Sequence, residues 1–352
     1  MESRKIQKVG AATLTISLPK EWAEKRNLKK GDQVFLVEDG HALKVLPGPE
    51  SDERRRGAAE YIVDADLCDE PGMLERAIVG NYVRGREKII VRSALRLKGS
   101  HLDEVRRVTR RLMGIGIIEE TPSKLVLQCA VDPSKYPLDP LIRRLYGIAT
   151  TMLSEALGAL TARDIALADD ALKREDDADM MYWLVHRLVM SAQRDDGLLE
   201  RLGMRSRLEI LGDRVVARDL EAVADQCCLI ARCSKEVIAL DVRVPGSITT
   251  ALEDLATLVR DAYDVALAAL LTRDLRKANQ AIRLCAGLRK PEENLLRLLL
   301  KEVRDARAVV PLRGIHGSLT QIGGYVRSMA VIACNRYLEQ PTNLCRPATA
   351  DE

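Results

Sequence analysis

The pattern of apolar and polar residues changes twice along this chain of 352 residues. Up to residue 47, apolar and polar residues alternate in short runs separated by Lys30-Gly31-Asp32 and Asp39-Gly40, which is typical of strands joined by hairpins. These residues supply too few core side chains for independent stability, so we expect residues 1–47 to dimerise. A charged segment rich in Pro and Gly, residues 47–57, is interpreted as a linker.

Residues 58–133 show a second pattern, in which strand-like alternation and helical periodicity follow one another. This pattern predicts a small α/β domain of βαβαββ order. Its strands and helices are expected at 61–67, 71–84, 88–91, 102–113, 115–119 and 124–129. Three prolines, Pro133, Pro137 and Pro140, then forbid a regular element and mark the boundary of the domain.

From residue 138 on, the chain has long helical patterns rich in Leu and Ala, and these patterns repeat. A shift of 110 positions places Leu145 on Leu255 and Arg163-Asp164 on Arg273-Asp274. Each copy is long enough for three helices that bury their apolar stripes against one another. The helices are expected at 139–162, 164–194 and 204–241, and again at 247–271, 274–304 and 312–338. The sequence therefore predicts a multidomain, mainly α-helical protein with two tandem three-helix bundles, 138–242 and 247–340.

The composition of the chain excludes several classes of protein. Four His without a metal-ligand spacing argue against zinc catalysis, and eight Cys without a C-x-x-C pair indicate a reduced, cytoplasmic protein. No run of 18 residues is apolar and free of charge, so we expect no membrane span. Phosphate-loop, dinucleotide-binding and serine-hydrolase motifs are missing as well, and we therefore expect a protein that is not an enzyme.

Carboxylates spaced four residues apart occur on two consecutive helices of the first bundle. Glu175 and Asp179 share one helix face, and Glu221 and Asp225 share a face of the next helix. If both pairs point into the bundle at one seam, they form an oxygen cage suited to a divalent or ferric metal ion. The alternative is an acidic, solvated helix face.

The second bundle does not keep these four carboxylates. The shift of 110 positions places Cys285 and Arg289 on the first pair, and an alignment of the last helices places Thr320 and Gly324 on the second pair. We therefore expect a metal ion to bind once per chain, in the first bundle only.

The net charge of +3 conceals a basic segment near the N-terminus. Residues 3–30 hold eight Lys or Arg against two Glu, and a dimer would double this patch, enough to neutralise several phosphates of double-stranded DNA. We expect DNA contacts at Arg4, Lys5, Lys8 and Lys20, with Lys25 and Arg26 flanking them. The alternatives are solvated surface charges and a unit that only dimerises.

The same segment resembles the AbrB/SpoVT/MazE family of swapped-hairpin DNA-binding domains. The resemblance lies in Leu18-Pro19-Lys20 and in Leu28 followed by Gly31-Asp32. It implies an N-terminal swapped-hairpin β-barrel in which two chains interleave, a homodimer, and DNA contacts made by basic residues of the early loops.

Residues 138–340 resemble the PhoU proteins, through their tandem bundles and the string that runs from Arg218-Asp219-Leu220-Glu221 to Asp225. This resemblance implies phosphate homeostasis and metal clusters on the carboxylates. The two modules together resemble the archaeal phosphate uptake regulators, so we expect a transcriptional regulator of phosphate transport. A phosphate ABC transporter or a two-component protein is a further expected partner. Two alternatives stay open: a transporter-binding adaptor whose N-terminal unit only dimerises, and a carboxylate-metal enzyme.

Overall fold

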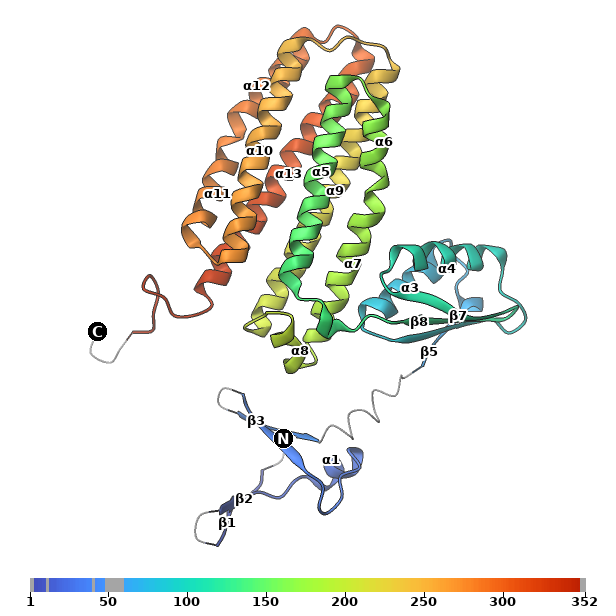
Figure 1. The fold of residues 1–352 in the computed structure, drawn as a ribbon, viewed down its shortest axis with the longest axis vertical. Helices are drawn as coiled ribbons and strands as arrows, with labels where there is room; N and C mark the ends of the chain where they lie inside the picture. The colour runs from blue at the N-terminus through green and yellow to red at the C-terminus, as the bar shows by residue number, and fades with distance from the viewer. Residues whose placement is uncertain (1–2, 11–12, 40–41, 48–59, 349–352) are drawn as a thin grey trace. The chain divides into compact units, whose positions relative to one another are not determined.

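The computed structural model describes residues 3–10, 13–39, 42–47 and 60–348 of the chain. These residues belong to two compact units, Met1–Tyr61 and Ile62–Glu352 (Figure 1). The expected linker at 47–57 falls almost wholly outside the described residues, as does Gly40 of the expected Asp39-Gly40 turn.

The first unit consists of strand hairpins, as expected, together with one short helix. Its elements are β1 Gln7–Val9, β2 Thr13–Thr15, α1 Lys20–Lys25, β3 Val34–Asp39 and β4 Ala42–Pro47. Gly31, at a φ of 99°, turns the chain after α1, and the Lys29 backbone N–H donates to the Asp32 carboxylate at 2.7 Å. Within the described residues, β1 pairs with β2 and β3 with β4, and no barrel closes. The interleaved barrel needs a second chain and stays a prediction.

The second unit begins with a four-stranded sheet covered on one face by two helices (Figure 1). Its elements are β5 Tyr61–Asp64, α3 Met73–Val83, β6 Lys88–Arg92, α4 Gly99–Arg111, β7 Ile115–Thr121 and β8 Lys124–Cys129. The sheet order is β5-β6-β8-β7, with β8 antiparallel to both β6 and β7. Alternate residues of β6, Ile89 and Val91, are buried, and β8 buries three consecutive residues, Leu125, Val126 and Leu127. The predicted βαβαββ order is confirmed.

The first bundle has the three expected helical segments, but the second segment is divided. Its helices are α5 Leu138–Ala162, α6 Ile165–Lys173, α7 Glu175–Ala192, α8 Asp196–Arg201 and α9 Arg207–Ala239. The break falls at Arg174, whose guanidinium donates twice to the Glu155 carboxylate of α5, each time at 2.8 Å. Glu175, Asp176 and Asp177 follow at once and stabilise the N-terminus of the new helix.

The second bundle repeats this arrangement. Its helices are α10 Gly246–Thr272, α11 Leu275–Gly287, α12 Arg289–Glu302 and α13 Ala306–Leu338. The expected start of the last helix at 312 is wrong, because the Asp305 side chain caps an earlier turn by accepting from the Arg307 backbone N–H at 3.0 Å. Pro311 consequently lies inside α13.

The internal repeat is visible at matched positions of the two bundles. Leu145 and Leu255 are both fully buried, and Arg163 and Arg273 both end a helix in the left-handed conformation, at φ of 56° and 52°. The residue after each arginine, Asp164 or Asp274, caps the next helix. The two bundles pack together mainly along α9 and α13, so residues 62–352 form one unit, and the expected boundaries within it stay predictions.

Among the described residues, none of the helices is both long and apolar enough to span a membrane. All eight cysteines are free thiols.

Candidate functional site

The six cations expected to contact DNA lie on and around the first hairpin and the short helix. Lys8 is on β1, Lys20 and Lys25 are the first and last residues of α1, and Arg26 caps the end of α1. Arg4 and Lys5 precede β1. Five of the six side chains are exposed, and Arg26 is half-buried. The arrangement leaves the charges accessible to a phosphate backbone, and DNA contact stays a prediction.

The first unit has no core of its own in the described residues. None of its described side chains is buried, and Trp22 of α1 is only half-buried. Large apolar side chains are left in water instead. They include Ile6, Val9, Leu14, Ile16, Phe35, Leu36 and Leu43, each at least half exposed. Burying a side chain of this size contributes about 1.5–3 kcal/mol, so a surface that covers these side chains would stabilise the unit.

The carboxylates expected to bind metal lie on α7 and α9, which pack against each other. Burial raises the pKa of Asp225, the nearby Arg218 acts to lower it, and the charges of Asp179 and Glu175 raise it further. Glu175 faces Arg232 at 3.4 Å. The structure therefore brings three of the four carboxylates within electrostatic reach of one another.

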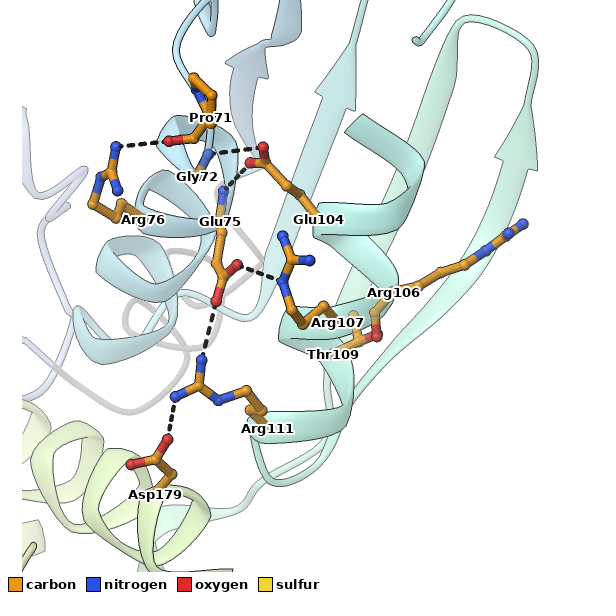
Figure 2. Close-up of polar contacts among 10 residues, drawn as sticks. All are labelled: Pro71, Gly72, Glu75, Arg76, Glu104, Arg106, Arg107, Thr109, Arg111 and Asp179. Carbon is orange, nitrogen blue, oxygen red and sulfur yellow. Dashed lines mark hydrogen bonds and ion pairs between the residues drawn. The ribbon is translucent and has the colours of Figure 1, made fainter. Parts of the chain in front are cut away.

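Asp179 makes contact outside the first bundle. It lies on the face of α7 that packs against α4 of the α/β domain, where its carboxylate accepts from the Arg111 guanidinium (Figure 2). The Asp179 side chain is largely buried in this contact. Helical spacing gives a shared face but does not say which neighbour covers it.

Arg111 belongs to a larger ionic network within the α/β domain. It also donates to Glu75 at 3.2 Å, and Arg107, one turn before it on α4, donates to Glu75 at 2.9 Å (Figure 2). The buried Glu104 accepts the backbone N–H groups of Gly72 and Glu75 at 2.8 and 3.0 Å. Although burial acts to raise the pKa of Glu104, these two bonds lower it, so the carboxylate is charged at the N-terminus of α3.

A second contact between α7 and the α/β domain comes from Arg187. This side chain is 1% exposed, and it donates to the backbone carbonyls of Tyr82 and Arg86 at 2.5 and 3.1 Å. Its guanidinium carbon also lies 4.8 Å from the centre of the Tyr82 ring. The guanidinium thus satisfies carbonyls at the C-terminal end of α3.

The four carboxylates, as arranged here, do not fit a metal ion. Arg111 is paired with Asp179, and Arg218 is paired with Glu221 and lies 3.9 Å from Asp225. Across the described parts of the chain, no three His, Cys, Asp or Glu side chains are placed to hold a metal. A metal ion at this seam would have to displace Arg111 and Arg218. It stays a prediction, which metal analysis of the wild type against Glu221→Ala and Asp225→Ala would test.

Arg107, Arg111 and Arg187 were not among the residues predicted from the sequence. A signal for the first two was present, because Arg106-Arg107 and Arg110-Arg111 stand four residues apart on one predicted helix. Such a row complements the acidic string at 169–179. Arg187 gave no signal, since a single arginine in an apolar helical pattern resembles any surface charge.

Two family models match parts of the chain. The PhoU domain matches residues 142–234, and the family described as antidote-toxin recognition MazE, bacterial antitoxin, matches residues 7–52. Both resemblances are confirmed over these segments, whereas an archaeal origin stays a prediction. No curated protein matches the chain. A crystal structure of PhoU from Pseudomonas aeruginosa is similar at 18% identity and a TM-score of 0.47, covering 56% of this chain and 94% of that one.

Proposed function

We propose that this chain, which pairs a MazE-type N-terminal segment with a PhoU domain, is a homodimeric, DNA-binding regulator of phosphate homeostasis. The PhoU match supports the phosphate role, and the MazE match supports dimerisation and a nucleic-acid or protein partner. Transcriptional control of phosphate transport is the finer part of the proposal.

The observation that carries the proposal is the exposed surface of the first unit. Its described apolar residues find no core, which favours a second copy of the unit as partner, and its cations remain exposed. A dimer would present Arg4, Lys5, Lys8 and Lys20 twice, and paired basic patches of this kind neutralise phosphates along a duplex. The PhoU domain would then supply the regulatory input.

The test is the salt dependence of DNA binding by the full-length protein. Retention of a duplex DNA pool should fall steeply as salt rises, because bound cations release counterions from the DNA. Lys5→Ala combined with Lys8→Ala should weaken retention about tenfold or more and flatten the salt dependence. The matched control is Lys290→Ala with Lys301→Ala, two exposed lysines of α12, which should leave retention unchanged.

Light scattering on the same samples separates the proposal from its main alternative. A dimer that binds DNA supports the regulator. A dimer that does not retain DNA even at low salt would favour a transporter-binding adaptor, whose N-terminal unit serves only to dimerise. A monomer would contradict both.

A further inference from the structure

A cavity of about 520 Å³ lies where α3 and α4 of the α/β domain meet α7 of the first bundle. Its volume is within the range of small-molecule sites, about 300–1,000 Å³, and such sites are frequent where two packed parts of a protein meet. Most of its lining is apolar. The apolar lining consists of Val79 and Val83 of α3, Val108 and Leu112 of α4, and Trp183 of α7.

The polar edge of the cavity carries an excess of positive charge. Glu75, at this edge, is already bound by Arg107 and Arg111, whereas Arg76 donates only to the backbone carbonyl of Pro71, at 3.2 Å, in the described structure. Figure 2 shows the Arg76 side chain beside Pro71 and apart from the Glu75 carboxylate. His186 adds no charge, because burial and the nearby Arg214 lower its pKa to about 4. The edge therefore favours an anion.

Two N–H groups among the residues that line this cavity have no acceptor in the described structure. Arg111 donates through its two terminal nitrogens, but its Nε is buried without a partner. The Nε2 of His186 accepts from Arg214 at 3.0 Å, so the proton of the neutral ring is on Nδ1, which is also buried without a partner. Buried donors without acceptors cost free energy, and such groups call for an explanation.

A glycine inside α3 keeps one wall of the cavity open. Gly80 lines the cavity in the interior of the helix, and a Cβ built on it would meet no atom within 4 Å. Close packing therefore does not require this glycine, although glycine weakens a helix interior relative to alanine. Because Gly80 has no side chain, the cavity extends up to the backbone of α3 at this position.

We propose that this cavity binds a small amphipathic carboxylate, with its acid group at Arg76 and its apolar or planar body against Trp183 and the valines of α3. Such a ligand touches α3, α4 and α7 at once, so its binding would strengthen the contact between the α/β domain and the first bundle. The site is independent of the N-terminal unit and of DNA binding.

The test uses calorimetry on the full-length protein with three probes that separate the two parts of the proposed ligand. Naphthylacetate combines a planar body with a carboxylate, naphthylethanol keeps the body without the charge, and acetate keeps the charge without the body. We expect saturable binding of naphthylacetate, binding about tenfold weaker for naphthylethanol, and none for acetate at the same millimolar concentrations.

Two variants place the binding in this cavity. Gly80→Leu fills the open space and should abolish naphthylacetate binding, while Gly147→Leu, at a glycine of α5 with equally open surroundings, should leave it unchanged. Arg76→Gln should weaken naphthylacetate to the level of naphthylethanol and leave naphthylethanol unaffected. Gly80→Leu should also keep or raise the melting temperature, which shows that lost binding does not come from unfolding.

The proposal is overturned if wild-type protein gives no saturable heat with naphthylacetate. It is equally overturned if Gly80→Leu, still folded by its melting temperature, binds naphthylacetate as the wild type does, because the probe then binds elsewhere. If wild-type protein binds naphthylacetate and naphthylethanol with equal affinity, Arg76 does not bind the carboxylate and the proposal of an acidic ligand is overturned.

Discussion

The two helical bundles share one backbone plan and differ in what their surfaces carry. Arg163 and Arg273 end their helices in the same left-handed conformation, and α9 and α13 are both 33 residues long. Yet, within the described residues, the first bundle packs a helix, α7, against α3 and α4 of the α/β domain, and the second bundle makes no contact of similar extent with that domain. The two bundles therefore share the positions that shape their helices. They differ at positions where the first bundle contacts the α/β domain.

Two residues of α7 differ in their contacts from the residues at the matching positions of α12. Arg187 is buried against α3, whereas Arg297, its counterpart at a shift of 110, is exposed and donates to Asn294 at 2.7 Å. Asp179 binds Arg111, whereas its counterpart Arg289 donates to Glu293 at 2.9 Å. In each case a substitution in the first bundle can be compared with a substitution at the matching residue of the second bundle, which serves as the control.

The two bundles also differ in the residues with which α9 and α13 pack against each other. A shift of 99 positions places Arg207 on Ala306, the first residues of these helices. Asp213 of α9 forms a buried ion pair with Arg336 of α13. The repeat maps these two onto Leu312 and Val237, which are both 1% exposed. One end of the crossing is therefore ionic and the corresponding end is apolar.

The largest effect is expected from breaking that ion pair on one side. Asp213→Leu leaves Arg336 buried without its carboxylate and should lower the free energy of unfolding by about 3–5 kcal/mol. Adding Arg336→Val gives this end the same two apolar residue types as the other end, and the double variant should return to wild-type stability or exceed it. Urea unfolding of the full-length protein measures both. A double variant as unstable as the single one would show that the two ends are not interchangeable.

The same pair gives a pH dependence. Burial raises the pKa of Asp213 to about 6, against the effect of Arg336, so the folded state holds this proton more tightly than the unfolded state does. The contribution of Asp213 to the free energy of unfolding should therefore fall as pH rises from about 4 to 6 and stay level above, by at most about 3 kcal/mol. Other acids titrate in the same range, so the quantity to measure is the difference between wild type and Asp213→Asn. A difference that is flat between pH 4 and 6 would contradict it.

The buried arginine of α7 should matter next. Arg187→Ala leaves the carbonyls of Tyr82 and Arg86 without their donor and opens a cavity, and we expect a loss of about 2–3 kcal/mol in unfolding free energy. Arg297→Ala, at the exposed counterpart, should change it by less than about 0.5 kcal/mol. Thermal and urea unfolding measure both variants. Equal losses of unfolding free energy would show that Arg187 contributes no more to stability than Arg297 does.

The Arg111–Asp179 pair should have the smallest effect on stability. Arg111→Ala leaves Asp179 beside other carboxylates, but partial exposure of Arg111 limits the expected loss to about 1 kcal/mol. Asp179→Asn in the same chain should recover part of it, because the unpaired charge is removed. The control is Arg289→Ala, whose exposed pair with Glu293 should be worth about 0.5 kcal/mol or less. A loss no larger than that of the control would show that this contact does not hold α4 to α7.

Much of the fold was predictable because its signals are local and repeated. Apolar spacing places the helices, and the equivalence of Leu145 with Leu255 reports a bundle that occurs twice. The division of the second helix in each bundle, at Arg174 and at Leu288, was not predictable, because a charged residue or a leucine at either point is compatible with a continuous helix.

The site was predictable in part. Spacing correctly placed Glu175 and Asp179 on one helix and Glu221 and Asp225 on the next. What covers those faces is a property of the tertiary structure. The arginine that meets Asp179 comes from position 111, in a domain whose docking face leaves no periodic signature in the sequence.

The proposed regulation of phosphate uptake through DNA binding is measured most directly by genome-wide DNA occupancy. In cells that express the chain, occupancy should concentrate near genes for phosphate uptake and should change between phosphate-rich and phosphate-poor growth. The Lys5→Ala, Lys8→Ala variant, at equal abundance, should lose these peaks. Occupancy no higher than that of this variant, or peaks that ignore phosphate, would contradict the account.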